Sequence, residues 1–339
     1  MRKVVLSGYY GFDNFGDEAI LQVLTNNLKN IGADITVISH NPAKTAITYD
    51  VKSVFMFNIF EIIKKINSSD ILISGGGSLL QDVTSLRSLI YYLFIIFLGI
   101  LFCKRVIIFA QGIGPINNNY FKKMTKNILR KTALITVRDK QSKNLLESWG
   151  LKSTIVDDPV WGIRVKNSRP NGKVGIQLRS WKYMSDEFFL NLVRQVAKDF
   201  SDKEIYIYSL QDRQDKELCL QFESYLHIEN PKVHTKVLYD MNVNEIIESM
   251  ADLEYLIAMR YHAILIGLKY GIKTLAINYD PKVEKLAKFA KIPCISFEEN
   301  EKFHTYFEQM RNLSRRNILL EVNKKRFSFD IFENEIKTD

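Results

Sequence analysis

Short apolar runs alternate with amphipathic helical segments along most of the chain, and this alternation limits the possible folds more than any other feature. Early examples of the apolar runs are Lys3–Ser7, Asp34–Ser39 and Asp70–Ser74. Strands that alternate with helices form parallel sheets with right-handed crossovers, because each helix returns the chain to the same edge of the sheet. The pattern therefore predicts a doubly wound α/β fold.

The alternation is interrupted between Gly162 and Gly172, where proline and asparagine lie between two glycines. A chain of 339 residues is also longer than one ordinary hydrophobic core requires. We therefore expect two Rossmann-like doubly wound domains, residues 1–162 and 173–300, facing a central cleft. A charged helical tail over residues 301–339 is expected to follow, loose beyond Lys325.

Composition excludes several functional classes. The three cysteines lie far apart and the five histidines show no ligand spacing, so neither a disulfide framework nor a metal site is expected. The net charge of +9 is spread along the chain, which argues against nucleic-acid binding and suits anionic substrates or a membrane face. The apolar run at the N-terminus is too short for a signal peptide, so we expect a cytoplasmic protein.

The longest apolar run, Leu89–Cys103, is shorter than the roughly 20 residues that span a bilayer. It is interpreted as a buried helix of the first domain. The alternative is a helix that partly faces the membrane interface, which Tyr91, Tyr92 and the following Lys104-Arg105 favour. That alternative predicts peripheral contact with the inner face of the cell membrane.

Three loops follow strands of the first domain, where parallel sheets collect ligands. The first, Gly8–Gly16, lacks the dinucleotide motif G-x-G-x-x-G and leads into Asp17 and Glu18. Carboxylates there repel a phosphate but accept hydrogen bonds from sugar hydroxyls; the alternative is that they stabilise the helix dipole. The others, Gly75–Asp82 and Gln111–Pro115, contain glycines that permit close approach of a ligand or of another backbone.

In the second domain, the sequence AMRYHAILIG (Ala258–Gly267) places Arg260 and His262 at a strand-to-helix turn. A guanidinium there can bind a phosphate or carboxylate through two hydrogen bonds, and an imidazole can donate a proton. The alternative is an arginine that caps a structural carboxylate and a histidine satisfied in the core. Arg179 and Lys282 follow other strands of the same domain and should lie at the same edge.

Seven stretches, in order along the chain, resemble the polysaccharide pyruvyl transferase family, in particular its bacterial secondary-cell-wall-polymer branch. They are GYYGFDNFGDEAIL (Gly8–Leu21), SGGGSLLQD (Ser74–Asp82), AQGIGP (Ala110–Pro115), VRD (Val137–Asp139), DDP (Asp157–Pro159), MRYHA (Met259–Ala263) and NYDPKV (Asn278–Val283). One departure is Tyr261, where many relatives carry leucine.

The resemblance implies a glycosyltransferase-B-like (GT-B-like) architecture and transfer of the enolpyruvyl unit of phosphoenolpyruvate to two hydroxyls of a sugar. The product would be a cyclic pyruvate ketal on a cell-surface polysaccharide. The acceptor expected is an N-acetylhexosamine such as N-acetylmannosamine, free or lipid-linked, and phosphoenolpyruvate is the donor substrate with no further cofactor.

The resemblance also assigns roles to residues. Arg260, His262 and Lys282 are expected to bind the donor in a pocket without compensating acids; Arg179 is added from its strand-end position, and Arg138 is a further candidate unless it pairs with Asp139. His262 either acts as general acid or steadies the departing phosphate. The carboxylates that could serve as general base are Asp13, Asp17 and Glu18. The residues expected to orient the acceptor are Asn14, Gly16, Asp17, Gln81 and Asp82.

Two other functions fit the same architecture, because a fold does not fix a function. The first is a GT-B nucleotide-sugar glycosyltransferase, in which Glu298 or Glu299 would hold a ribose. The second is a non-catalytic sugar-binding protein.

Overall fold

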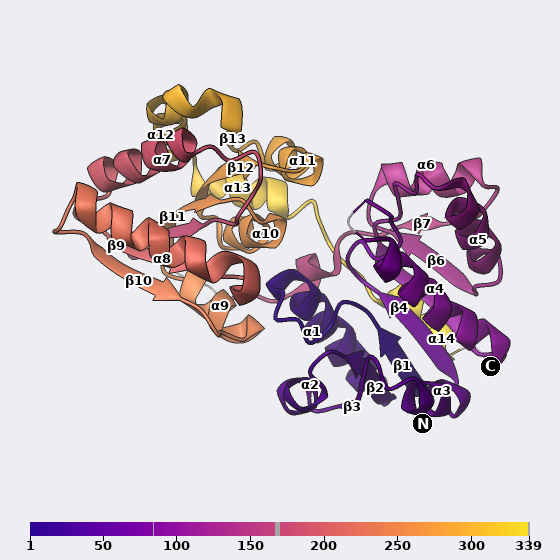
Figure 1. The fold of residues 1–339 in the computed structure, drawn as a ribbon. Helices are drawn as coiled ribbons and strands as arrows, with labels where there is room; N and C mark the ends of the chain where they lie inside the picture. The colour runs from indigo at the N-terminus through magenta and orange to yellow at the C-terminus, as the bar shows by residue number, and fades with distance from the viewer. Residues whose placement is uncertain (84, 167–169, 338–339) are drawn as a thin grey trace. The chain divides into compact units, whose positions relative to one another are not determined.

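The computed structural model describes residues 1–83, 85–166 and 170–337 and divides into two compact units. Unit 1 comprises Met1–Ile163 and Arg326–Asp339, and unit 2 comprises Arg164–Lys325. Each unit contains one parallel sheet whose strands alternate with helices, as Figure 1 shows. The predicted fold class, two Rossmann-like doubly wound domains, is confirmed in these terms.

The sheet of unit 1 has seven strands in the order β3-β2-β1-β4-β5-β6-β7. Its elements are β1 (Lys3–Ser7), α1 (Phe15–Asn30), β2 (Asp34–Ser39), α2 (Pro42–Tyr49), β3 (Lys52–Phe55), α3 (Ile59–Asn67), β4 (Ile71–Gly75), α4 (Leu86–Leu101), β5 (Arg105–Gln111), α5 (Asn119–Leu129), β6 (Leu134–Val137), α6 (Lys140–Ser148), β7 (Thr154–Ile155), the 3-10 helix η1 (Pro159–Gly162) and α14 (Asp330–Lys337). The strand order reverses direction between β1 and β4.

The sheet of unit 2 has six strands in the order β10-β9-β8-β11-β12-β13. Its elements are β8 (Lys173–Gln177), α7 (Asp186–Asp199), β9 (Glu204–Tyr208), α8 (Asp212–Glu229), β10 (His234–Leu238), α9 (Val243–Met250), β11 (Leu253–Ala258), α10 (Tyr261–Tyr270), β12 (Lys273–Asn278), α11 (Pro281–Ala290), β13 (Cys294–Ser296), the 3-10 helix η2 (Phe297–Lys302), α12 (Phe303–Arg311) and α13 (Arg315–Val322). Here the order reverses between β8 and β11.

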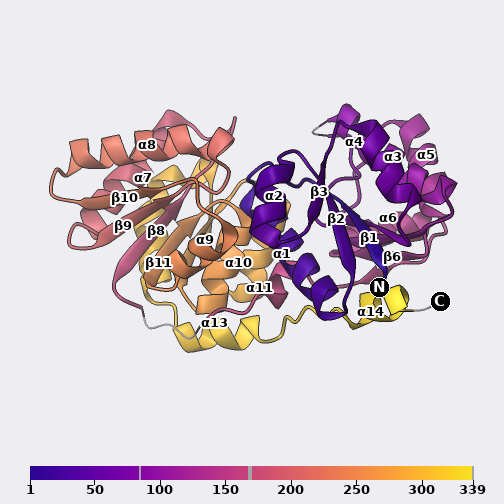
Figure 2. The ribbon, with the colours of Figure 1, turned by 90° about the horizontal axis from the view of Figure 1, so that it is seen from below.

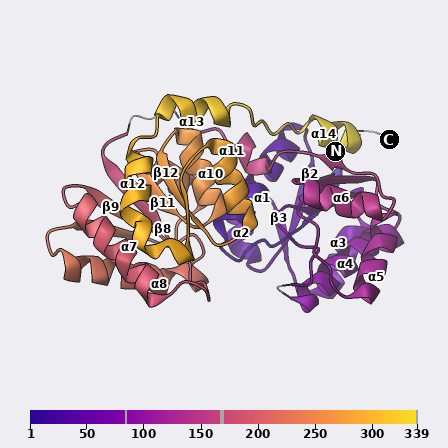
Figure 3. The same cartoon turned by 90° about the horizontal axis from the view of Figure 1, so that it is seen from above.

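In both units the core lies between the sheet and a layer of helices. In unit 1, apolar side chains of α3, α4, α5 and α6 pack on one face of the sheet; Figure 2 shows α3, α4 and α5 together. In unit 2, α7, α8 and α12 cover one face, while α10 and its neighbours α9, α11 and α13 form a second layer; Figure 3 labels all of these helices except α9. Adjacent residues of β11 serve the two layers: Ile257 belongs to the first core, and Leu256 contacts Gly267 of α10.

The C-terminal tail differs from the expectation of a single segment that is loose beyond Lys325. Its first part, with α12 and α13, belongs to unit 2, whereas α14 belongs to unit 1. The rings of Phe327, Phe329 and Phe332 pack against Phe109 of β5, with the Phe109–Phe332 centroids 4.5 Å apart. Burial of these aromatic side chains fixes the segment, because removing them from water stabilises it.

Two further helices depart from the sequence prediction. Helix α2 was not predicted from the sequence. Asn41 caps it by accepting a hydrogen bond from the Lys44 backbone amide, and Pro42 occupies its first turn. Helix α4 was interpreted as buried, yet it exposes large apolar side chains along one face. No helix within the described residues is long and apolar enough to cross a membrane.

Candidate functional site

Several candidate site residues lie at the points where each sheet reverses its strand order, whereas Lys282 follows β12 and Arg138 follows β6. Parallel strands all end at the same edge, and the divergence of the connecting loops at a reversal leaves room for a ligand there. In unit 2, Arg179 follows β8 and Arg260 follows the neighbouring strand β11. In unit 1, the loop after β1 and the glycine-rich loop after β4 meet in the same way.

Arg260 forms the central ion pair of the unit 2 site. Its Nε and Nη2 each donate a 2.7 Å hydrogen bond to a different oxygen of Asp215, on α8. The two side chains are 10% and 0% exposed, and Asp215 also accepts hydrogen bonds from the backbone amides of Leu210 and Gln211. The arrangement is the alternative considered for Arg260, an arginine that caps a structural carboxylate. Its predicted contact with the donor stays a prediction.

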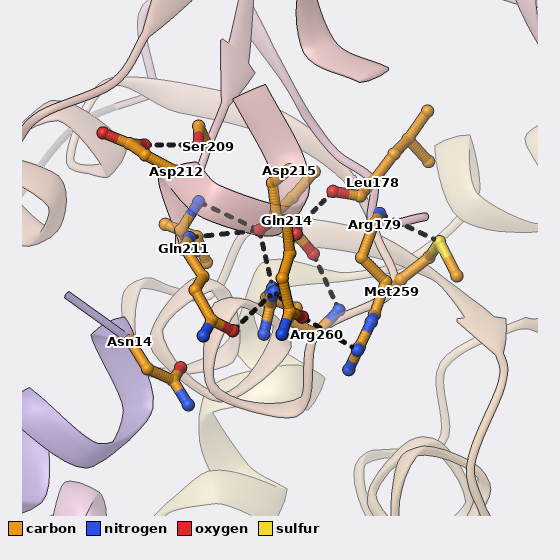
Figure 4. Close-up of polar contacts among 12 residues, drawn as sticks. Asn14, Leu178, Arg179, Ser209, Gln211, Asp212, Gln214, Asp215, Met259 and Arg260 are labelled. Carbon is orange, nitrogen blue, oxygen red and sulfur yellow. Dashed lines mark hydrogen bonds and ion pairs between the residues drawn. The ribbon is translucent and has the colours of Figure 1, made fainter. Parts of the chain in front are cut away.

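Gln214 connects this ion pair to Arg179, as Figure 4 shows. The Gln214 Oε1 accepts hydrogen bonds from Arg260 Nη2 at 3.4 Å and from Arg179 Nη2 at 3.1 Å. Gln177 at the end of β8 accepts a 2.7 Å hydrogen bond from the Arg260 backbone amide. The two arginines are therefore held in one network that originates at the Asp215 carboxylate.

Aromatic rings pack around Arg179 and Lys282. The Arg179 guanidinium lies 5.3 Å from the Trp181 ring centroid and 5.1 Å from that of Tyr279. The Lys282 ammonium lies 5.9 Å from the same Tyr279 ring and 3.6 Å from an oxygen of Asp280, which caps α11. The expectation that the cations lack compensating acids is wrong, because Asp215 and Asp280 pair with two of them.

His262 is the second residue of α10, two positions after Arg260. Its side chain is partly buried, and its ring lies edge-on to that of Tyr261 with the centroids 5.1 Å apart. The structure thus places His262 in the first turn of the helix that starts at the strand reversal, as the sequence predicted. Its role in proton transfer stays a prediction.

The two loops of unit 1 meet at Asp17. Asn14 caps α1 by accepting a hydrogen bond from the Gly16 backbone amide, and its Nδ2 donates a 2.6 Å hydrogen bond to Asp17. A Cβ added to Gly77 would lie 2.6 Å from Asp17 Oδ1, and Gly77 has φ +69°. Only glycine therefore fits this approach without strain, and it lets the carboxylate lie directly against the glycine-rich loop.

Glu18 has a different environment from Asp17. One carboxylate oxygen accepts a 2.7 Å hydrogen bond from the Gly11 backbone amide, and the other accepts a 2.7 Å hydrogen bond from the Tyr49 hydroxyl. Desolvation by burial raises the pKa of Glu18 above its ordinary value, against the lowering effect of these hydrogen bonds. Glu18 thus fastens the loop after β1 to α2.

The raised pKa of Glu18 predicts a pH dependence of stability. A carboxyl group that binds its proton more tightly when folded stabilises the protein below its unfolded pKa, about 4.3, and that contribution is lost as the pH rises through the folded value. The stability of the Glu18→Gln variant should not show this decrease with rising pH, because glutamine does not titrate. Urea unfolding midpoints of both proteins between pH 4 and 8 should therefore diverge with pH, and parallel curves would contradict the assignment.

Asp13 is the most exposed of the three candidate bases. Its side chain is 52% exposed and pairs with the Lys44 ammonium of α2 at 2.9 Å. Its φ is +55°, a region that aspartate enters more readily than most residues but still at some cost. The ion pair links the loop after β1 to α2 at Asp13.

Asp82 joins two loops. One of its oxygens accepts hydrogen bonds from the backbone amides of Asn117 and Asn118 at 2.8 and 2.9 Å, which lowers the pKa of the carboxyl group. The Gln81 side chain accepts a 2.7 Å hydrogen bond from the Val83 amide. These residues, predicted to orient the acceptor, stabilise the loops; their contact with a sugar stays a prediction.

Arg138 pairs with Asp158, whereas the alternative considered for it was a pair with Asp139. Its Nη1 donates to Asp158 at 3.1 Å and its Nη2 donates to the Ser78 hydroxyl at 2.9 Å. Asp139 instead caps α6 by accepting from the Ser142 amide. Arg138 thus links the glycine-rich loop after β4 to the start of η1.

Residues 14–281 match the family model described as polysaccharide pyruvyl transferase. The chain belongs to this family. No curated protein matches the chain with significance. The matched range includes the whole β8–β11 reversal of unit 2, with Arg179, Arg260 and His262, and in unit 1 it includes Asp17 and β4 but begins after β1.

Similarity to solved structures shows the GT-B type of fold. UDP-GlcNAc 2-epimerase from Methanocaldococcus jannaschii has a TM-score of 0.64 and 11% identity, covering 93% of this chain and 94% of that one. Anabaena HepE, in complex with UDP-glucose, has a TM-score of 0.61 and 11% identity over 99% and 98% of the two chains. A glycosyltransferase from Rickettsia africae has a TM-score of 0.60 and 16% identity over the whole of both.

Sequence reasoning missed several residues that hold the candidate site together. Asp215 precedes Arg260 by 45 positions, and no local pattern connects them. Lys44 and Tyr49 lie on the unexpected helix α2. Acidic and amide residues that open α8 directly after β9 were the available signal for Asp215, because they follow a strand end of the same sheet.

Among the described residues, no group of three or more histidine, cysteine, aspartate or glutamate side chains could hold a metal ion.

Proposed function

We propose that this protein transfers the enolpyruvyl group of phosphoenolpyruvate to two hydroxyls of a saccharide, forming a cyclic pyruvate ketal and releasing phosphate. The acceptor we propose is a lipid-linked N-acetylhexosamine, such as N-acetylmannosamine, used at the cytoplasmic face of the membrane. Family membership supports the reaction class, and the arginine network at the β8–β11 reversal is the observation that carries the choice of donor.

Phosphoenolpyruvate carries a phosphate and a carboxylate on three carbons, so its site requires cations with defined orientation. Arg179 and Lys282 approach the same Tyr279 ring from the ends of β8 and β12. We assign them the donor anions, because guanidinium and ammonium groups make charge-assisted hydrogen bonds to both. Arg260 acts as a positioning residue in this proposal, since its hydrogen bonds to Asp215 and Gln214 hold Arg179.

The reaction requires a proton on the methylene carbon of the donor, which generates a cationic centre at C2. We assign His262 to this proton transfer or to the departing phosphate. The first sugar hydroxyl attacks C2 and loses its proton, the C2–O bond to phosphate breaks, and the second hydroxyl closes the ring. One hydroxyl proton replaces the proton given to the methyl group, and the other leaves with phosphate.

We assign the general base to Asp17 among the three candidate carboxylates. Asp17 lies against Gly77 at the β1–β4 reversal, whereas both oxygens of Glu18 accept hydrogen bonds within the loop and Asp13 pairs with Lys44. Arg138 receives no donor contact in this proposal, because its guanidinium bonds to Asp158 and Ser78.

Ligand-induced stabilisation tests the donor. Phosphoenolpyruvate at one hundred times its Kd should stabilise the protein by about 2.7 kcal/mol, whereas UDP-N-acetylglucosamine should not stabilise it. The Arg179→Ala variant should bind phosphoenolpyruvate about tenfold to a hundredfold more weakly, the effect of losing hydrogen bonds to a charged group. Thermal denaturation with each ligand measures both effects, with Arg194→Ala on the exposed face of α7 as the matched control.

Stabilisation by the UDP-sugar alone would overturn the proposal in favour of a nucleotide-sugar glycosyltransferase. Phosphate release that depends on both phosphoenolpyruvate and an N-acetylhexosamine acceptor would exclude a non-catalytic sugar-binding protein. Mass spectrometry of the acceptor should then show the added pyruvate ketal.

A further inference from the structure

One face of unit 1 carries a continuous apolar stripe that no other part of the described chain covers. On α4, Leu86, Ile90, Phe94, Phe97 and Leu101 are each between 39% and 56% exposed. They are spaced by four, four, three and four residues, which places them on one side of a helix. At 1.5 Å per residue the stripe is about 22 Å long.

Neighbouring helices extend the stripe and surround it with positive charge. Helices α3 and α5 pack on either side of α4, and Figures 2 and 3 show the three together. Phe60 of α3 is 84% exposed, and Tyr120 of α5 is also exposed. Within the bounds of these helices, all of which are described, the basic residues are Lys64, Lys65, Arg87, Lys122, Lys123 and Lys126, and the acidic residue is Glu61.

We infer that the α3–α4–α5 face of unit 1 docks into the surface of an anionic lipid bilayer. This inference rests on the lipid-linked acceptor of the proposed function and names the surface that would bring the enzyme to it. An apolar helix face with flanking lysines and arginines is typical of helices that lie in the headgroup region: the apolar side chains enter the acyl boundary, and the bases contact anionic lipids.

Charge favours the bilayer over a second copy of the chain. In a two-fold dimer, the same surface patch lies on both sides of the contact. The exposed bases Lys64, Arg87, Lys122 and Lys123 would then face their own copies across the contact, with Glu61 as the acid on these helices. An anionic membrane instead attracts all of them.

A row of aromatic rings joins this face to the acceptor loop. Tyr9 and Phe12 stack at 4.1 Å, and Phe12 stacks on His40 at 4.4 Å. The row continues through Phe55 and Phe57 to Tyr91 of α4, with centroid separations of 6.2, 5.6 and 6.4 Å. The Tyr91 hydroxyl donates a 2.9 Å hydrogen bond to the Met56 carbonyl, so α4 is fastened to the end of β3. A saccharide anchored in a bilayer at α4 could therefore reach the loop after β1 along a single surface of unit 1.

Vesicle co-sedimentation tests the docking. The full chain should bind vesicles of phosphatidylglycerol and phosphatidylcholine in equal parts and bind pure phosphatidylcholine vesicles more weakly. The Phe94→Ser/Phe97→Ser variant should bind the anionic vesicles about tenfold more weakly or worse, because less apolar surface is removed from water. The Lys122→Gln/Lys123→Gln variant should also bind the anionic vesicles about tenfold more weakly. Added salt should lower the affinity of the wild-type protein for these vesicles toward that of the variant.

The matched control is Leu220→Ser/Ile228→Ser on α8 of unit 2, which removes two exposed apolar side chains elsewhere and should leave binding unchanged. The inference is overturned if the wild-type chain does not sediment with anionic vesicles, or if the Phe94→Ser/Phe97→Ser variant binds as well as the control. A dimer in light scattering that this variant dissociates would assign the stripe to a second copy and overturn it too.

Failure of the docking and failure of the proposed function give different results. Vesicle binding is measured without donor or acceptor, and phosphate release is measured with a soluble saccharide acceptor and no lipid. Turnover without vesicle binding overturns the docking alone. Vesicle binding without turnover of any acceptor, soluble or lipid-linked, supports the docking and contradicts the transferase proposal.

Discussion

The His262→Ala variant is expected to lower kcat by about 10²–10⁴, the contribution of one well-placed acid or base, while the protein remains folded. His262 lies in the first turn of α10 and is partly exposed, so its loss leaves no large cavity in the core. Steady-state phosphate release with saturating phosphoenolpyruvate and acceptor measures the change, and circular dichroism checks the fold.

Tyr261→Phe is the matched control, because it changes the adjacent side chain of the same turn and should retain turnover near the wild-type value. Added imidazole that restores turnover to His262→Ala would identify a proton-transfer role rather than a phosphate contact. Asp17→Asn should lose comparable turnover. Near-normal kcat for His262→Ala would refute the role of this histidine, whatever the behaviour of the other variants.

The Asp215→Ala variant should destabilise unit 2 by about 3–5 kcal/mol, the cost of removing one partner of a buried ion pair. Asp215 is fully buried, and its loss leaves the Arg260 guanidinium without its two shortest hydrogen bonds. The amides of Leu210 and Gln211 lose their acceptor at the same time. Hydrogen exchange followed by mass spectrometry should show faster exchange in α8 and β11, with peptides of unit 1 unchanged.

Glu284→Ala provides the comparison for an exposed pair, since its partner Lys288 lies four residues on along α11. Exposed helical pairs of this kind add little to stability because solvent screens them, so this variant should exchange almost as the wild type does. Asp215→Ala combined with Arg260→Met should regain part of the lost stability, because the unpaired buried charge is gone. Equal exchange in Asp215→Ala and Glu284→Ala would mean that the buried pair does not hold the strand reversal.

The sequence predicted the two sheets because strand and helix signals are local. Runs such as Lys3–Ser7 and Leu253–Ala258 are short, apolar and followed by polar or glycine-rich residues, and both are strands in the structure. The strand ends then placed Arg179, Arg260 and Lys282 at one edge, as observed. What the sequence could not provide was the set of long-range partners.

Ion pairs and hydrogen bonds between residues far apart in the sequence depend on which elements pack together. The alternation of strands and helices does not determine that packing. Arg260 was predicted either to bind an external anion or to cap a structural carboxylate, and the structure pairs it with Asp215 of the helix that follows β9, two strands from β11 in the sheet order. Asp82 was expected to face a sugar, yet it accepts backbone hydrogen bonds from the loop after β5. In both cases a charged group near a strand end has a partner inside the protein that the sequence pattern did not identify, and its contact with a ligand stays a prediction.

The return of the chain to unit 1 also bears on synthesis at the ribosome. The ring of Phe109 in β5 packs against those of Phe327, Phe329 and Phe332. These three residues are translated after every strand and helix of unit 2. Unit 2 is continuous in sequence, so it can finish folding while part of the first-made sheet still lacks its aromatic cover. Nascent chains stalled before residue 326 would therefore carry an open apolar patch on unit 1, the region where chaperone binding should concentrate.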